Sequence, residues 1–286
     1  MKKTLIILGN GFDLDLGWRT SYKDFYQAKK ARFAEFNGMR YIQDMVQGGH
    51  WHDLEGYIRT CLKEMPQSRA EEMLHFWWIC RNLMFDYFTS IRTEMYNTNK
   101  SSCAYKFLTG ITEKSTIVTF NYTNPFRQNG IPIKATKFIH IHGDIENTTN
   151  STKLKLGVDK YVIDENSIVK CEQTLPIIKS HENKYIDKLF RLLKIHKDII
   201  FYGHSLGQTD ADYFKSYFQH IISGNISGQN IYLVTKDSNG LQQIKDNLKK
   251  YDVEYDDIAL SKCNVMPVYT KDGVNSNEFQ QLLELI

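Results

Sequence analysis

Cysteine and proline are scarce in this chain. Its 286 residues contain five of each, and no Gly/Ser-rich or low-complexity stretch is present. The scarcity of proline and of Gly/Ser-rich segments argues against long linkers between domains. The cysteines are scattered and include no Cys-x-x-Cys pair, which argues against a zinc ribbon. An odd number of thiols without a secretion signal is typical of reduced cysteines, so we expect a cytoplasmic protein.

Long apolar runs and an excess of one charge are also lacking. Only five apolar-rich residues precede Gly9, fewer than a signal peptide needs, and no run approaches the roughly 18 residues of a transmembrane helix. Lys and Arg number 36 against 33 Asp and Glu, which gives a net charge of +3. This balance gives no electrostatic reason to expect nucleic acid as a partner, and we expect no membrane partner either.

Short apolar runs rich in β-forming residues recur along the chain. They are Thr4–Leu8, Thr116–Thr119, Phe138–Ile141, Ile199–Tyr202, Ile231–Val234 and Val265–Val268. The first is apolar almost throughout, which is typical of a strand buried on both faces of a parallel sheet. Helical patterns separate several of the runs, and such alternation indicates parallel strands joined by crossover helices. We predict an α/β protein with a Rossmann-like, mostly parallel sheet flanked by helices.

A region without convincing strands interrupts this alternation. The best helix in it runs from Arg69 to about Met95, and Ser68 with Glu71 forms a capping-box pattern at its start. Apolar residues recur along that helix at helical spacing, and we expect them to pack in the core: Met73, Phe76, Trp77, Cys80, Leu83, Met84, Tyr87, Phe88 and Ile91. We predict a nucleotide-binding domain of residues 1–25 and 111–286, with residues 26–110 as a helical insertion.

The rest of the chain carries weaker local signals. Further helices are expected over residues 183–196, 210–223, 239–250 and 277–286. The polar residues 146–155 indicate a loop, and residues 161–180 are ambiguous.

A glycine turn follows the first predicted strand, with the sequence Gly9-Asn10-Gly11-Phe12-Asp13. Glycine permits positive φ and close approach of a backbone to a ligand. A junction of strand, glycine and helix directs free N–H groups at a phosphate. The pattern is not a complete G-x-G-x-x-G, because position 14 is leucine, so a simple tight turn is the alternative.

Two more polar motifs follow strands, where the ligand crevice of a parallel sheet lies. Asn121 either presents its amide to a ribose hydroxyl or a water, or caps a turn ahead of Pro125. His140 and His142 would share one face of a strand, but no third ligand stands at metal spacing, so we expect no metal. His142 lies beside Gly143 at the strand end, and an imidazole there suits a general base.

A fourth motif, residues 203–207, matches the G-x-S-x-G pattern of a serine hydrolase. That reaction needs an acid and then a histidine later in the chain, and only His220 follows, inside a predicted helix. The alternative is a second ligand-binding turn, in which Gly203 allows close approach and Ser205 binds phosphate or ribose. Asp210 would cap the next helix or reach the ligand.

Four segments in this order resemble the AbiH-type abortive infection proteins of bacteria: residues 9–25, 119–123, 140–144 and 203–214. Residues 51–55 (WHDLE) are a weaker match. The set is also distantly similar to the sirtuin-like NAD-binding fold. Sirtuin deacylases carry a four-cysteine zinc module, which this chain cannot build.

That resemblance implies roles for particular residues. Gly9, Asn10, Gly11 and Phe12 would contact the pyrophosphate of NAD. Asn121 and His142 would face the nicotinamide ribose. Gly203 and Ser205 would hold the adenosine half, and Asp13 and Asp210 would complete the binding site.

The expected function is therefore NAD glycohydrolysis in phage defence. His142 would act as the base and Asn121 would position the water, with NAD as substrate and no prosthetic group. NADP or another nucleotide stays open as the ligand. A non-catalytic nucleotide sensor is the alternative, and a hydrolase using Ser205 is a third. An enzyme that destroys NAD must stay silent until infection, so we expect control by homo-oligomer assembly or by a phage-derived trigger.

Overall fold

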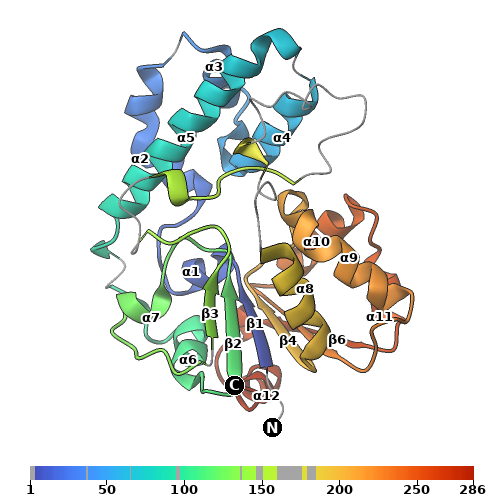
Figure 1. Ribbon diagram of the computed structural model, residues 1–286. Helices are drawn as coiled ribbons and strands as arrows, with labels where there is room; N and C mark the ends of the chain where they lie inside the picture. The colour runs from blue at the N-terminus through green and yellow to red at the C-terminus, as the bar shows by residue number, and fades with distance from the viewer. Residues whose placement is uncertain are drawn as a thin grey trace.

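A six-stranded parallel sheet forms the centre of the computed structural model (Figure 1). The structure describes residues 4–36, 38–64, 66–94, 97–135, 137–145, 151–159, 176–178 and 185–286. The strands are β1 Thr4–Leu8, β2 Ser115–Thr119, β3 Lys137–His140, β4 Asp198–Tyr202, β5 Asn230–Thr235 and β6 Asn264–Tyr269. All six predicted strands are confirmed, with ends shifted by no more than one residue. None of the described helices is both long enough and apolar enough to cross a membrane.

Helices and 3-10 turns connect these strands. The α-helices are α1 Asn10–Asp15, α2 Tyr22–Ala34, α3 Arg40–Gln47, α4 Leu54–Glu64, α5 Ala70–Ser90, α6 Cys103–Gly110, α7 Pro125–Gln128, α8 Tyr185–Ile195, α9 Ala211–Ile222, α10 Ser238–Lys249, α11 Tyr255–Ala259 and α12 Asn277–Leu283. The 3-10 turns are η1 His50–Asp53, η2 Gln67–Arg69, η4 Ser151–Lys153, η8 Gln208–Asp210 and η9 Thr270–Asp272.

The strand order is β3-β2-β1-β4-β5-β6, with every neighbouring pair parallel. This is the order of dinucleotide-binding Rossmann domains. The chain builds outward from β1 to β3, then returns to the other side of β1 to form β4. The neighbours β1 and β4 therefore flank the point where the order reverses, and ligands of such sheets bind outside the carboxyl ends of these strands. The predicted Rossmann-like fold class is confirmed.

Both faces of the sheet are buried, as the apolar strands predict. Ile6 and Leu8 of β1 belong to one hydrophobic cluster, which includes residues of α1, α6 and α12. Leu5 and Ile7 point to the opposite face and join a second cluster built with α8, α9, α10 and α11. In Figure 1, α6 and α7 lie on one side of the strands and α8 to α11 on the other. Alternate side chains therefore anchor two helical layers on one sheet.

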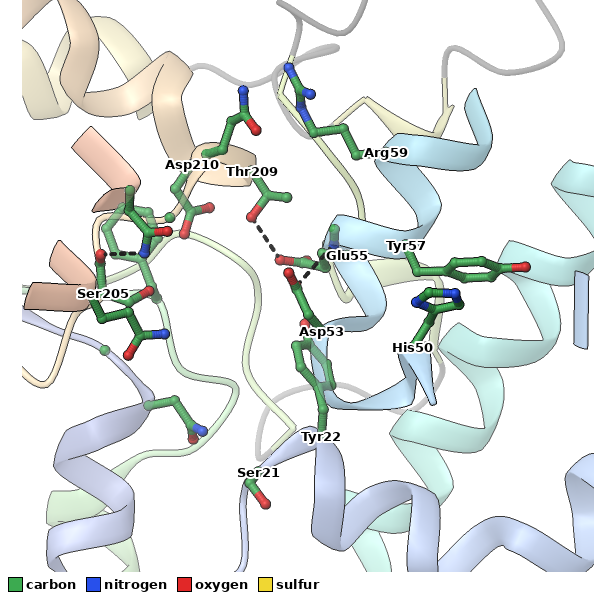
Figure 2. A pocket seen from close by; sticks show the side chains of 18 of the residues that line it. Ser21, Tyr22, His50, Asp53, Glu55, Tyr57, Arg59, Ser205, Thr209 and Asp210 are labelled. Carbon is green, nitrogen blue, oxygen red and sulfur yellow. Dashed lines mark hydrogen bonds between the residues drawn. The ribbon is translucent and has the colours of Figure 1, made fainter. Parts of the chain in front are cut away.

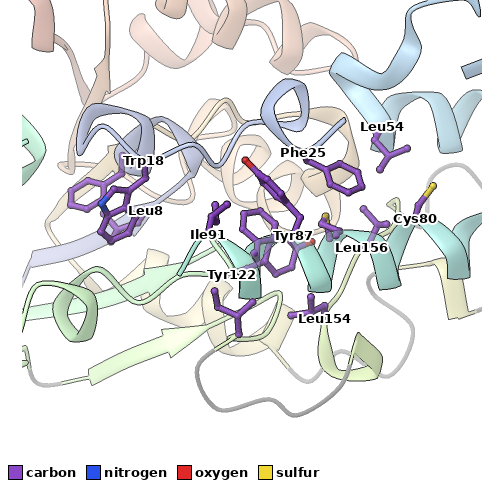
Figure 3. Close-up of a cluster of buried hydrophobic side chains, with 14 of the residues drawn as sticks. Leu8, Trp18, Phe25, Leu54, Cys80, Tyr87, Ile91, Tyr122, Leu154 and Leu156 are labelled. Carbon is purple, nitrogen blue, oxygen red and sulfur yellow. The ribbon is translucent and has the colours of Figure 1, made fainter. Parts of the chain in front are cut away.

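The helices α2 to α5 form a separate group of elements above the carboxyl ends of the strands in Figure 1. No strand occurs among the described residues between β1 and β2. The apolar core continues from the sheet into this group: Leu8 and Trp18 belong to the same cluster as Phe25 and Tyr87 (Figure 3). Helix α6 packs against α1 and α12, so it covers the sheet. The predicted boundaries of the helical insertion, 26–110, stay a prediction.

The predicted apolar stripe is confirmed as core, because all nine of its members are buried. The helix α5 ends at Ser90 rather than at about Met95, so Ile91 follows it. The predicted capping box at its start is wrong. Ser68 lies inside η2, and the residue that precedes the helix is Arg69, which forms no side-chain cap. The Arg69 guanidinium instead pairs with Glu72, with 2.7 Å between Nη2 and Oε2.

The other predicted helices are confirmed as α8, α9, α10 and α12, and α12 ends at Leu283 rather than at Ile286. Of the predicted loop 146–155, residues 151–153 form η4, and residues 146–150 lie outside the described residues. The ambiguous segment 161–180 also lies outside them, except for residues 176–178.

Adjacent tryptophans on α5 provide a matched test of this core. Trp77 is 5% exposed and its indole donates a hydrogen bond to the Leu156 carbonyl, whereas Trp78 is 50% exposed. Trp77→Ala should lower the free energy of unfolding by about 3 kcal/mol, because it leaves a cavity and an unpaired carbonyl. Trp78→Ala should lower it by less than about 1 kcal/mol. Urea unfolding of both variants checks this, and equal losses would contradict the packing.

Candidate functional site

A cavity of about 1860 Å³ opens at the carboxyl ends of the strands, beside the β1–β4 switch point. It is larger than the roughly 300–1,000 Å³ of common small-molecule pockets, so it has room for an extended ligand. Its walls come from loops of the sheet and from α3, α4 and α10 (Figure 2). Nine of the predicted site residues line it: Gly9, Asn10, Gly11, Asp13, Asn121, His142, Gly203, Ser205 and Asp210. The tenth, Phe12, has a fully buried side chain that packs against Tyr202 and Phe107.

The two glycine turns of this site lie against each other. A Cβ at Gly9 would come within 2.5 Å of His204 Cα, and one at Gly11 within 2.7 Å of Gly203 Cα. Gly203 has φ of 63°, and a Cβ there would lie 2.2 Å from the Phe12 nitrogen. Glycine is therefore required at all three positions for the β1–α1 and β4–η8 loops to meet, before any ligand is considered.

Backbone hydrogen bonds join the same turns. The Gly11 N–H donates to the Gly203 carbonyl at 2.8 Å, and the Phe12 N–H donates to the Gly9 carbonyl at 2.9 Å. These N–H groups are thus engaged within the protein. Asn10 is the exposed residue of the turn, and its Oδ1 accepts a 2.6 Å hydrogen bond from the Thr20 hydroxyl. The exposed side chain that this turn presents at the cavity is therefore that of Asn10.

Asp13 links the glycine turn to the polar motif after β2. Its carboxylate accepts hydrogen bonds from the Asn121 amide at 2.8 Å and from the Thr123 hydroxyl at 2.6 Å. The same Asn121 Nδ2 also donates to the Gly9 carbonyl at 3.1 Å. Both N–H bonds of this amide therefore hold the loops together, and Oδ1 is the atom of Asn121 suited to accept a hydrogen bond from a water or a ribose hydroxyl.

Burial raises the pKa of the Asp13 carboxyl from 3.8 to about 7, against the lowering effect of hydrogen bonds from Thr123 and Asn121. The folded state therefore favours the protonated acid. Asp13 stabilises the fold fully below about pH 4, and this contribution is lost as the pH rises to about 7. Above that pH the carboxylate is ionised in both states, and no further change is expected from this residue.

Asp13→Asn should remove this pH dependence, because the amide keeps the shape and stays neutral. The free energy of unfolding of the variant, relative to wild type, should rise by up to about 4 kcal/mol between pH 4 and pH 8. Urea titrations across this range measure the difference, and Asp246→Asn on the exposed face of α10 serves as the control. A pH-independent difference for Asp13→Asn would contradict the assignment.

A chain of two histidines and one carboxylate lies on the cavity wall. His142 is 4% exposed, and its Nε2 lies 3.4 Å from Asp210 Oδ1. In the described part of the chain this nitrogen has no hydrogen-bond partner, since the contact lacks hydrogen-bond geometry. His204 Nε2 lies 3.7 Å from the other oxygen of Asp210. The His204 Nδ1 accepts a hydrogen bond from the Leu206 N–H, so a neutral ring carries its proton on Nε2, facing Asp210.

His140 does not share this site with His142. The strand β3 ends at His140, so the two side chains enter different surroundings. The His140 ring contacts the Asn121 carbonyl at 3.4 Å and Asp144 at 3.7 Å. Burial lowers its pKa, partly offset by the charge of Asp144. Among the described residues, no group of three or more His, Cys, Asp or Glu side chains is placed to hold a metal ion.

Helix α4 adds a carboxylate that the sequence analysis did not select. Glu55 is 8% exposed, and its Oε2 accepts a hydrogen bond from the Thr209 hydroxyl at 3.2 Å (Figure 2). Its Oε1 accepts from the Gly157 N–H, also at 3.2 Å. One turn further along α4, Arg59 pairs with the buried Asp159 at 2.8 Å. The hydrogen bond between Thr209 and Glu55 therefore holds the helical region next to Asp210. The weak motif at residues 51–55 was the only sequence signal for Glu55.

Ser205 does not have the geometry of a hydrolase nucleophile. In a nucleophile elbow the serine itself sits at the strained point of the turn. Here the positive φ angles fall on Gly203 (63°) and Leu206 (49°). Ser205 is an exposed residue on the cavity wall, and its carbonyl accepts a hydrogen bond from the Asn247 amide at 2.9 Å.

The strand order and the cavity define the class of this protein: a Rossmann-like α/β protein with a large cavity at its switch point. Residues 5–228 match the family model described as bacteriophage abortive infection AbiH. Because this match covers more than half of the chain, the protein belongs to the AbiH family of phage abortive infection proteins. No curated protein matches the chain. The distant similarity to the sirtuin-like NAD-binding fold stays a prediction.

Proposed function

We propose that this AbiH protein binds NAD in the cavity and hydrolyses the bond between nicotinamide and its ribose. The observation that carries the proposal is the His142–Asp210 pair on the wall of a cavity at the β1–β4 switch point. Nucleotides bind parallel α/β sheets at this position. A histidine beside a carboxylate in such a cavity supports acid–base chemistry on the bound ligand.

The proposed reaction consumes one water. The bond from ribose C1′ to the nicotinamide nitrogen breaks, its electron pair stays on that nitrogen, and the water oxygen bonds to C1′. The products are ADP-ribose, nicotinamide and one proton, which the His142–Asp210 pair takes up. A general base of this kind contributes about 10²–10⁴-fold to the rate. Asn121 Oδ1 accepts a hydrogen bond from the water or from the ribose.

A non-catalytic nucleotide sensor is the second candidate. One observation favours it: both N–H bonds of the Asn121 amide hold the protein's own loops together. A sensor needs the cavity but no released product. A serine hydrolase is not favoured, because Ser205 lacks the strained backbone of a nucleophile elbow. We therefore expect no labelling of this serine by a fluorophosphonate probe.

Purified protein incubated with NAD distinguishes these candidates. The glycohydrolase releases ADP-ribose and nicotinamide in equal amounts, which chromatography measures. The sensor binds NAD or ADP-ribose saturably in calorimetry without product. If the protein shows no binding of NAD or ADP-ribose and releases no product, the proposal of a nucleotide site is overturned. Because we propose control by homo-oligomer assembly or a phage-derived trigger, the binding measurement is made alongside turnover.

A further inference from the structure

We infer that the wall formed by α4 selects the cationic, oxidised nicotinamide ring, and that Glu55 carries this selection. The inference rests on the proposed function, because it concerns the nicotinamide end of the same cavity. It assigns to the helical region a role in specificity that none of the four sheet-end motifs supplies.

Carboxylates from separate segments converge on this part of the cavity. Figure 2 shows Asp53 and Glu55 side by side, with Thr209 and Asp210 across from them and Tyr22 below. All five residues line the cavity. Asp53 and Glu55 come from η1 and α4, whereas Thr209 and Asp210 come from η8, which follows β4. The hydrogen bond from Thr209 to Glu55 fixes the two walls relative to each other.

Burial and the nearby carboxyl groups raise the pKa values of two tyrosines in this part of the cavity. The pKa of Tyr22 is raised well above its ordinary value, first by removal of its hydroxyl from water and then by the negative charge of Glu55. The pKa of Tyr122 is raised for the same reasons in the same order, and the negative charge of Asp210 contributes after that of Glu55. Both phenols therefore stay neutral at physiological pH, so neutral aromatic rings lie beside the carboxyl groups of this wall.

Such a wall is complementary to a flat cation. Tyr22, Phe88, Phe120 and Tyr122 present aromatic groups to the same cavity, and a cation gains from the faces of such rings as well as from carboxylates. The nicotinamide ring of NAD⁺ carries one positive charge, and the ribose becomes positive as the glycosidic bond breaks. The dihydronicotinamide of NADH is neutral and has nearly the same size, so charge is the property that separates the two ligands.

A second observation points to a ligand in the cavity beside this wall. His142 is 94% buried by side chain, lines the cavity, and has an Nε2 without a hydrogen-bond partner among the described residues. Buried polar atoms in native proteins are normally paired, so an unpaired one calls for a ligand or a functional role. Its nearest carboxylate is Asp210, the residue next to Thr209.

Calorimetry with carba-NAD⁺ and its reduced form tests the selection, because neither analogue can be cleaved at the ribose. We expect the wild-type protein to bind the oxidised form about tenfold more tightly than the reduced form. Glu55→Gln, which can still accept from Gly157 and bond to Thr209, should bring the two affinities within about threefold of each other. ADP-ribose, which lacks the ring, should bind wild type and variant equally and shows that the variant is folded.

Two further variants separate charge from structure. Thr209→Val removes the hydrogen bond and leaves the carboxylate, so the preference for the oxidised form should persist. Glu64→Gln makes the same chemical change on the same helix, at an exposed residue of the cavity, and should also leave the preference unchanged. A Glu64→Gln effect as large as that of Glu55→Gln would overturn the assignment to Glu55.

The failures are distinguishable. If wild type binds ADP-ribose and both analogues with equal affinity for the two redox forms, the selection is overturned while the proposed nucleotide site survives. If Glu55→Gln retains the full preference, Glu55 is not its source. If wild type binds none of the three ligands, the proposed function itself fails.

Discussion

Replacing His142 by alanine is expected to lower the rate of NAD cleavage by about 10²–10⁴-fold, the usual contribution of a general base. The variant loses the ring whose Nε2 faces Asp210 at 3.4 Å. Asp210→Asn should lower the rate by a similar factor, because it removes the carboxylate between His142 and His204. Since the residues act as a unit, the double variant should be little slower than either single one.

The measurement is release of nicotinamide under saturating NAD, with ADP-ribose affinity and the unfolding midpoint recorded for each variant. Unchanged binding separates loss of chemistry from loss of the fold. His75→Ala is the control, because His75 is exposed on α5 and does not line the cavity. If His142→Ala cleaves NAD at the wild-type rate, His142 is not the base.

Gly203→Val is expected to destabilise the fold by about 5 kcal/mol or more, which is comparable to the total stability of many domains. Its Cβ would lie 2.2 Å from the Phe12 nitrogen and 2.4 Å from the Gly11 carbonyl carbon, both of them backbone atoms that cannot swing away. The φ of 63° adds strain for a β-branched residue. The β1–α1 and β4–η8 loops would be forced apart, so the cavity should be lost with the fold.

Gly207→Ala tests the same loop without either problem. Its Cβ would meet nothing closer than Ser205 Oγ at 3.5 Å, and the φ of Gly207 is −63°. We expect a change within about 1 kcal/mol for this variant. Thermal and urea unfolding compare the two substitutions. A Gly203→Val protein as stable as wild type would contradict the close packing of the loops.

The glycines show how a correct local signal can have a different cause. The sequence placed Gly9, Gly11 and Gly203 just after strands. In the structure Gly9 and Gly203 directly follow β1 and β4, and Gly11 lies in the first turn of α1. Their spacing favoured contact with a phosphate. In the structure these positions require glycine because the two segments contact each other, and a side chain on any of the three would clash with the neighbouring segment. A single sequence cannot show which two turns will touch.

Asn121 illustrates a similar limit. Its position after β2 was predictable, because an apolar run ending in a polar motif indicates a strand end. Its partners were not predictable, because Asp13 lies in α1, far away in the sequence, and becomes a neighbour of Asn121 only when β1 and β2 pair. The sequence offered a turn cap as the alternative role for the Asn121 amide. It did not show that this amide donates to the buried carboxyl of Asp13, whose pKa is about 7.

Sequence alone determined the six strands, the parallel Rossmann-like sheet, the buried stripe of α5 and the order of the motifs at the strand ends. These follow from periodicity and burial, which are local properties of the chain. Only the tertiary structure decided that Asp210 lies between His142 and His204, and that Glu55 of α4 faces Thr209. Such juxtapositions depend on how the helical region packs over the strand ends, and that packing is set by contacts between residues a hundred or more positions apart.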